Sequence, residues 1–169
     1  MRPAATKAPP IPIRPPPRKS PHRGWVDRVE VTRRLHAASV LVISQDIESA
    51  GRLFVGLGRL ACAVRLARLS VQAMLMLGEV QPSICVVDAD AGDLEASVLL
   101  RKLRAHAVTR DALFVALIAR PSPSRSRRLL RAGFDGVLSK PFDENLLPQE
   151  LMRGVPCLAA ATWHPHIAA

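Results

Sequence analysis

Short apolar runs alternate with longer stretches in which apolar residues recur every three or four positions. Continuous runs rich in Val, Ile and Leu are typical of strands that are buried on both faces of a sheet. The cleanest runs are residues 40–43, 84–87 and 113–118. The pattern predicts five strands, at residues 40–43, 62–66, 84–88, 113–118 and 136–139.

The stretches between these runs have the spacing of amphipathic helices. Asp46 and Ser70 stand just before two such stretches, where a side-chain oxygen can accept the free N–H groups of a first helical turn. Asn145 is the expected cap of the last helix, which puts Pro148 in the first turn, where its missing N–H is not needed. The order is therefore strand and helix in strict alternation, five times.

Strict alternation of this kind favours a three-layer α/β fold, with one doubly wound parallel sheet covered by helices on both faces. In such sheets, ligands bind beyond the carboxyl ends of the strands. Six residues stand at or just after a predicted strand end and should therefore share one edge: Ser44, Gln45, Asp46, Asp88, Ile118 and Lys140.

The chain ends differ in composition from this middle part. Residues 1–24 hold eight of the 15 prolines, and Pro excludes both helix and sheet ladders. We expect a disordered basic tail over residues 1–38, with a short helix within 25–38. The folded domain should span 39–154, and residues 155–169 should be loosely ordered.

Charge and composition narrow the class of protein. Residues 1–36 hold nine Lys or Arg against two Asp or Glu, so most of the net charge of +10 belongs to the tail. Aromatic residues make up only 4%, which predicts an aliphatic core. Cys62 and Cys85 lie inside apolar runs, as buried free thiols of a cytoplasmic protein would. No apolar stretch is long enough to span a membrane, and no secretory signal is evident.

Two residues at the predicted sheet edge carry candidate chemistry. Asp88 ends the most apolar strand, and Lys140 follows the last one. They could form an ion pair, or they could act as a phosphoryl acceptor and a cation that steadies the phosphoryl oxygens. The sequence has no glycine-rich phosphate loop, no nucleophile elbow and no His/Cys metal set, so we do not expect an enzyme.

Residues 82–88 and 132–142 resemble the third strand and the Lys-Pro block of receiver domains from two-component response regulators. The similarity runs from about residue 40 to residue 151. It implies a flavodoxin-like sheet with strand order 2-1-3-4-5. It also implies that Asp88 is the phospho-acceptor and that Lys140 contacts the phosphoryl group.

The sequence departs from this family at four site positions. Ser44 and Gln45 occupy the places of the acidic pair that holds Mg²⁺, and these neutral oxygens remove two charges from a metal site. Asp46 and Asp90 could partly compensate beside Asp88. Ile118 replaces the family's Ser or Thr, and Val137 replaces its switch aromatic.

The resemblance therefore predicts a stand-alone, atypical receiver that binds a histidine kinase or another signalling protein and is phosphorylated weakly or not at all. It implies a partner surface at Arg125, Arg127, Arg128 and Arg131. The same arginines could instead form a solvated helix face.

Three alternatives stay open. Asp88 could be an active phospho-acceptor that uses Mg²⁺. The basic tail could bind nucleic acid non-specifically, although the scarcity of aromatic side chains for base stacking argues against this. The chain could also form a homodimer.

Overall fold

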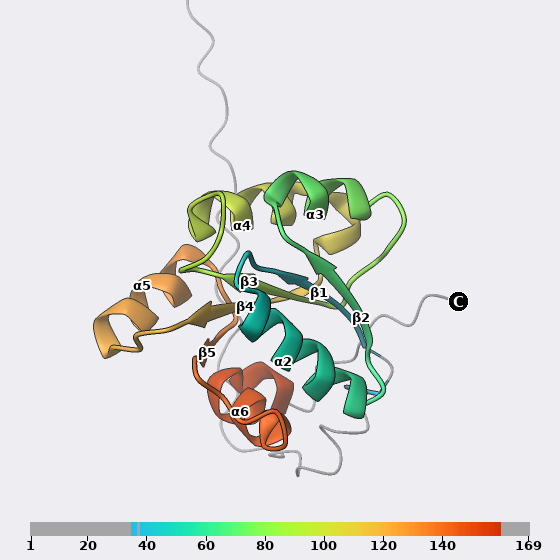
Figure 1. The fold of residues 1–169 in the computed structure, drawn as a ribbon. Coiled ribbons are helices and arrows are strands. Elements are labelled where there is room, and N and C mark those ends of the chain that lie inside the picture. Colours follow the sequence, from blue (N-terminus) through green and yellow to red (C-terminus); the bar gives the residue numbers. More distant parts are fainter. Residues whose placement is uncertain (1–34, 37, 160–169) are drawn as a thin grey trace, which may run out of the picture.

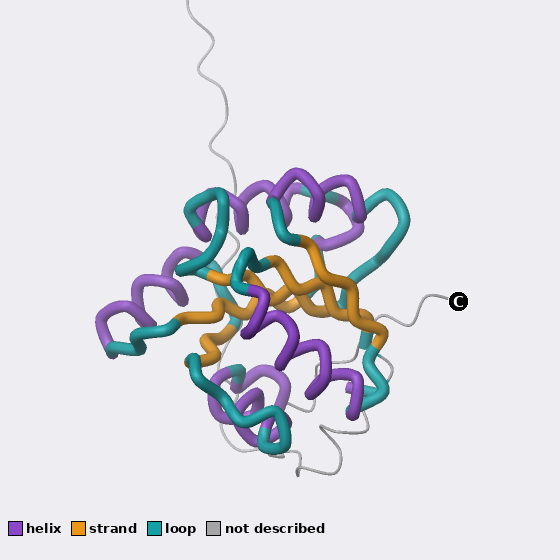
Figure 2. Tube along the Cα trace, in the orientation of Figure 1, coloured by secondary structure: helices purple, strands orange, loops and turns teal. Residues whose placement is uncertain are grey.

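The computed structural model describes residues 35–36 and 38–159 (Figure 2). Five parallel strands form one sheet in the order β2-β1-β3-β4-β5, which confirms the predicted flavodoxin-like topology. The strands are β1 (Ser39–Ile43), β2 (Ala63–Ala67), β3 (Ile84–Asp88), β4 (Leu113–Ile118) and β5 (Gly136–Ser139).

Helices cover both faces of the sheet, as Figure 1 shows. One face carries α2 (Ile47–Arg59) and α6 (Leu147–Gly154). The other carries α3 (Ser70–Met76), α4 (Ala96–Ala105) and α5 (Pro123–Ala132). Two short 3₁₀ turns follow α4 and α6, at Ala107–Thr109 and Pro156–Ala159.

Alternate side chains of each central strand point to opposite faces of the sheet and pack into two separate cores. In β3, Ile84 and Val86 pack toward α2 and α6, whereas Cys85 and Val87 pack toward α3 and α4. Cys62 and Cys85 are buried free thiols, as expected. Burial raises the pKa of Cys62 to about 11 and that of Cys85 to about 12, so both stay protonated.

The helix caps only partly match expectation. Asp46 caps α2 and accepts the N–H groups of Glu48 and Ser49. Ser70 is not a cap, because its N–H and hydroxyl both donate to Asp93, at 2.8 and 2.7 Å.

The cap predicted for the last helix is also wrong. Leu146 is the N-cap of α6, and Pro148 is its second residue. The Asn145 side chain is engaged elsewhere, since its amide nitrogen donates to Asp143 and its oxygen accepts from Arg59.

The folded part extends beyond both predicted limits. Leu35, Val155 and Leu158 are fully buried in the core beneath α2 and α6. Their apolar side chains fill this layer, so the predicted end at residue 154 falls short. The proline-rich segment, most of the predicted 25–38 helix and residues 160–169 lie outside the described residues. None of the helices that the structure describes is long and apolar enough to cross a membrane.

Candidate functional site

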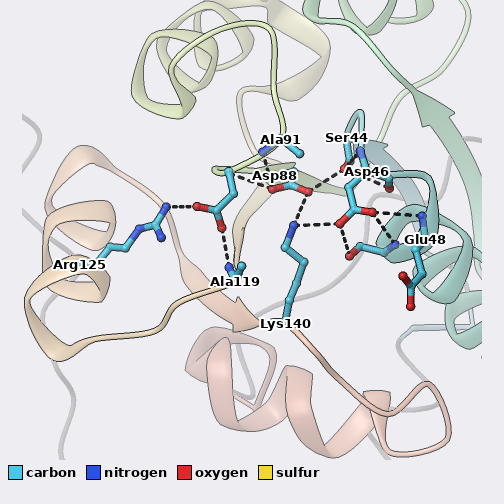
Figure 3. Close-up of polar contacts among 10 residues, drawn as sticks. Ser44, Asp46, Glu48, Asp88, Ala91, Ala119, Arg125 and Lys140 are labelled. Atoms are coloured by element: carbon cyan, nitrogen blue, oxygen red, sulfur yellow. Dashed lines mark hydrogen bonds and ion pairs between the residues drawn. The ribbon is translucent and has the colours of Figure 1, made fainter.

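The carboxyl edge of the sheet brings Asp88 and Lys140 together, as the sequence predicts (Figure 3). Asp88 is the last residue of β3, and Lys140 directly follows β5. The Lys140 Nζ lies 2.9 Å from Asp88 Oδ2. The Asp88 side chain is completely buried and that of Lys140 is 10% exposed, so solvent screens this ion pair little.

Both carboxylate oxygens of Asp88 are hydrogen-bonded. Oδ2 accepts the Ser44 hydroxyl at 2.7 Å as well as the Lys140 ammonium. Oδ1 accepts the backbone N–H groups of Asp90 and Ala91, at 2.9 and 3.0 Å. Four donors therefore hold the carboxylate in one orientation inside the protein.

Asp46 supplies the second carboxylate that Lys140 contacts. Its carboxylate accepts the Ser49 hydroxyl at 2.6 Å and the Lys140 ammonium at 3.2 Å. The bond from Ser49 is the main cause that lowers the pKa of Asp46 to about 2, with a further contribution from Lys140. Partial burial would lower the pKa of Lys140, but its bonds to Asp88 and Asp46 outweigh this and raise it.

These contacts predict an acid-sensitive contribution to stability from Asp46. Because its folded-state pKa is depressed, the stabilisation is present above about pH 4 and is lost as the pH falls toward 2. A third of the side chain is exposed, so after allowance for solvent screening we expect a loss of about 1 kcal/mol. Urea unfolding between pH 5 and 2 measures it.

The matched variant is Asp46→Asn, since an amide still caps a helix but does not titrate in this range. Its free energy of unfolding should fall less steeply with acid than that of the unmodified protein. Parallel pH profiles for the two proteins would contradict the assignment.

The Asp90 carboxylate bonds to neither Lys140 nor Ser44 but to two groups on the β4–α5 side of the edge. It accepts the backbone N–H of Ala119 and the guanidinium of Arg125. Burial alone would raise the pKa of Asp90, but these two bonds lower it overall. Asp90 therefore ties the loop after β3 to the start of α5 and is not directed toward Asp88.

The donor set does not fit Mg²⁺. This ion requires oxygen ligands in octahedral geometry, preferably including carboxylates. Here the ammonium of Lys140 bonds to both Asp46 and Asp88, and Asp90 is engaged by Arg125. Within residues 35–36 and 38–159, no three His, Cys, Asp or Glu side chains form a metal-binding group. The predicted ligand set of Asp46, Asp88 and Asp90 is not assembled.

The remaining predicted site positions supply no charge to the site. Ile118 is fully buried among the apolar residues beneath α4 and α5, and Val137 packs against the same core. The Gln45 side chain is exposed, while its backbone N–H donates to Ala91 O at 2.7 Å. The structure describes all six predicted edge residues. Among them, four are joined by side-chain contacts: Asp88 with Ser44 and Lys140, and Lys140 also with Asp46.

The four arginines predicted as a partner surface lie on α5. Arg125 is paired with Asp90, and the Nε of Arg127 donates to Pro123 O in its own helix. Arg127, Arg128 and Arg131 are exposed and, with Ser124, line an open hollow of about 490 Å³. The exposed surface of α5 around this hollow is therefore positively charged.

Sequence reasoning missed two parts of the site. Ser49 donates to Asp46, and Arg125 reaches across to Asp90. The first had a local signal, because a serine three residues after a capping aspartate lies within reach of it. The second depends on how two loops meet in space, for which the sequence offered no periodic signal.

No family model matches the sequence, and no curated protein matches it. Solved structures do match. The chemotaxis response regulator CheY4 of Vibrio cholerae superposes with a TM-score of 0.62 at 19% identity, over 69% of this chain and 97% of that one. A response regulator from Burkholderia pseudomallei, with a phosphorylated aspartic acid and calcium, gives 0.60 at 24% identity, over 72% and 68%.

A third match is the signal receiver domain of a histidine kinase from Syntrophus aciditrophicus, with a TM-score of 0.59 at 19% identity, over 78% and 98%. The chain has the receiver-domain fold. The similarity inferred from residues 82–88 and 132–142 is thereby confirmed at the level of the fold. Within the receiver fold, Asp88 ends the third strand of the sheet and Lys140 follows the fifth.

Proposed function

We propose that this chain is a receiver-fold protein-binding module of cytoplasmic phosphorelay signalling, which works without phosphorylation of Asp88. The observation that carries the proposal is the set of four donors around the Asp88 carboxylate. This arrangement makes the aspartate a structural centre of the sheet edge.

The chemistry of phosphoryl transfer supports this interpretation. A carboxylate that attacks phosphorus needs a free oxygen and nearby positive charge, usually from a metal ion, to neutralise the transferred group. The Asp88 side chain is fully buried, and the neutral Ser44 hydroxyl donates to the oxygen that also binds Lys140. With Ile118 in place of a hydroxyl, this position offers no side-chain donor for an incoming phosphoryl oxygen.

The partner in this proposal is a histidine kinase or another signalling protein, and the chain catalyses no reaction of its own. It binds through α5, where exposed Arg127, Arg128 and Arg131 offer charge to acidic residues of the partner. Because Asp88 lies inside the protein, replacing it with Asn should leave this binding intact.

A direct test incubates the full chain with acetyl phosphate and Mg²⁺ and measures the intact mass. We expect no phosphoryl adduct on the unmodified protein, whereas an active receiver treated in parallel gains one. Asp88→Asn serves as the matched control for modification at other residues.

An adduct that forms on the unmodified protein and is missing from Asp88→Asn would overturn the proposal. That result would favour the second candidate, an active phospho-acceptor, for which the Burkholderia pseudomallei neighbour with its phosphorylated aspartic acid gives the structural precedent.

A further inference from the structure

Helix α3 is a surface helix without a charged side chain. Its seven residues, Ser70–Met76, are Ser, Val, Gln, Ala, Met, Leu and Met. Ala73 is buried against the sheet, but Val71 and Leu75, one turn apart on the outer side, are 59% and 75% exposed. A helix that is apolar on its outer side as well as its inner side is typical of one that packs against a further protein surface.

Leu69, the residue before α3, adds a third exposed apolar side chain on this side of the sheet, at 42%. The other large apolar side chains exposed between residues 47 and 75 belong to the opposite face. Ile47, Phe54 and Val55 lie on α2, and Leu66 shares the face of Val64, which packs in the core beneath α2.

Two arginines lie on the α3 side of the β2 edge of the sheet. Arg65 lies two residues before Ala67, which packs into the core on the α3 side, so Arg65 is on that same face of the sheet. Arg68 follows in the connection to α3, and both side chains are exposed. Neither forms an ion pair within the described part of the chain, and the nearby Asp93 carboxylate is bonded to Ser70.

We propose that α3 and the adjacent β2 edge dock an acidic amphipathic helix of another protein. We call this the α3 surface, defined by Arg65, Arg68, Val71 and Leu75. Val71 and Leu75 would pack against an apolar stripe of the partner, and the two arginines would pair with carboxylates beside that stripe.

Charge selects this occupant over a second copy of the chain. In a twofold pair formed through α3, each copy would bring Arg65 and Arg68 but no free carboxylate to pair with them, since Asp93 is bonded to Ser70, and an interface with cations on both sides opposes association. A partner helix with Glu or Asp beside its apolar stripe relieves this repulsion and covers the apolar residues at once.

The α3 surface is separate from the arginines of α5. The two helices lie on the same face of the sheet with α4 between them, and β2 and β5 are the two opposite edges (Figure 1). The proposal thus goes beyond the function proposed above: a module with both surfaces can hold two partners at the same time and bring them together.

Selection from a displayed library of random 16-residue peptides, with the full chain as the target, tests the proposal. We expect some selected peptides to be rich in Glu and Asp with Leu at helical spacing. Their affinity should fall at least tenfold for Val71→Gln/Leu75→Gln and for Arg65→Glu/Arg68→Glu. Leu130→Gln, at a leucine 45% exposed on α5, is the matched control and should bind these peptides normally.

Three results would overturn the proposal. The first is a selection in which no acidic peptide loses affinity for the α3 variants. A selection that yields only peptides bound through α5, which lose affinity for Arg127→Glu/Arg131→Glu instead, belongs to this first result. The second is a dimer, seen by light scattering, that Val71→Gln/Leu75→Gln converts to a monomer, which would assign the surface to a second copy. The third is sedimentation with phosphatidylglycerol vesicles that the same variant abolishes, which would assign it to a lipid surface.

Discussion

Replacing Lys140 with Met should destabilise the protein by about 3 kcal/mol, because it leaves the buried carboxylate of Asp88 without its counter-ion. Met has a length similar to that of the Lys side chain but supplies no charge. Ser44 and two backbone N–H groups still bond to Asp88, which places the expected loss at the lower end for a broken buried ion pair. Urea unfolding at pH 7 measures the change.

A double-mutant cycle separates the lost ion pair from lost packing. Asp88→Asn should cost less than Lys140→Met, because Lys140 keeps its bond to Asp46. The double variant Asp88→Asn/Lys140→Met should be more stable than Lys140→Met alone, since no buried charge is left unpaired. Equal stability losses for Lys140→Met with and without Asp88 would show that the pair does not hold the edge together.

The three central strands of the sheet could be predicted from the sequence because they are buried on both faces. Continuous apolar runs with clear ends predicted β3 and β4 with the bounds that the structure has, residues 84–88 and 113–118. Strand β2 begins one residue later than predicted. The turn before it includes Ala61, with a φ of +56°, and its edge position gives it a weaker apolar pattern.

The meeting of Asp88 with Lys140 was also predictable, because parallel strands bring their carboxyl ends to one edge. The partners of the other carboxylates were not. Asp90 is two residues from Asp88, yet its bonds to Ala119 and Arg125 turn it away from a metal position. Such choices depend on which loop donors lie nearest after folding, and no pattern along the chain encodes them.

The ends of the domain were missed for a related reason. Leu35, Val155 and Leu158 lie outside the alternating strands and helices, and segments this short show no strand or helix periodicity that predicts burial. Their burial depends on the core formed by α2, α6 and the sheet, against which they pack only after folding.

Gly154→Ala should destabilise the protein by about 2–3 kcal/mol, because α6 lies directly against β5 at this residue. A Cβ on Gly154 would lie 2.1 Å from the carbonyl oxygen of Val137, far inside van der Waals contact, and the atom it meets is backbone and cannot rotate away. Relief requires α6 to move off the strand that leads to Lys140.

Gly58→Ala is the matched control, since a Cβ there meets nothing within 4 Å and α2 gains a better helix former. It should stabilise the protein by about 0.5–1 kcal/mol. Opposite signs for the two substitutions, measured by urea unfolding, would establish that the close approach of α6 and β5 is the cause. A loss of similar size in both would instead indicate that alanine is unfavourable for reasons unrelated to this contact. Because β5 ends one residue before Lys140, the same contact sets where the ammonium meets Asp88, so the stability losses of Gly154→Ala and Lys140→Met should not be additive.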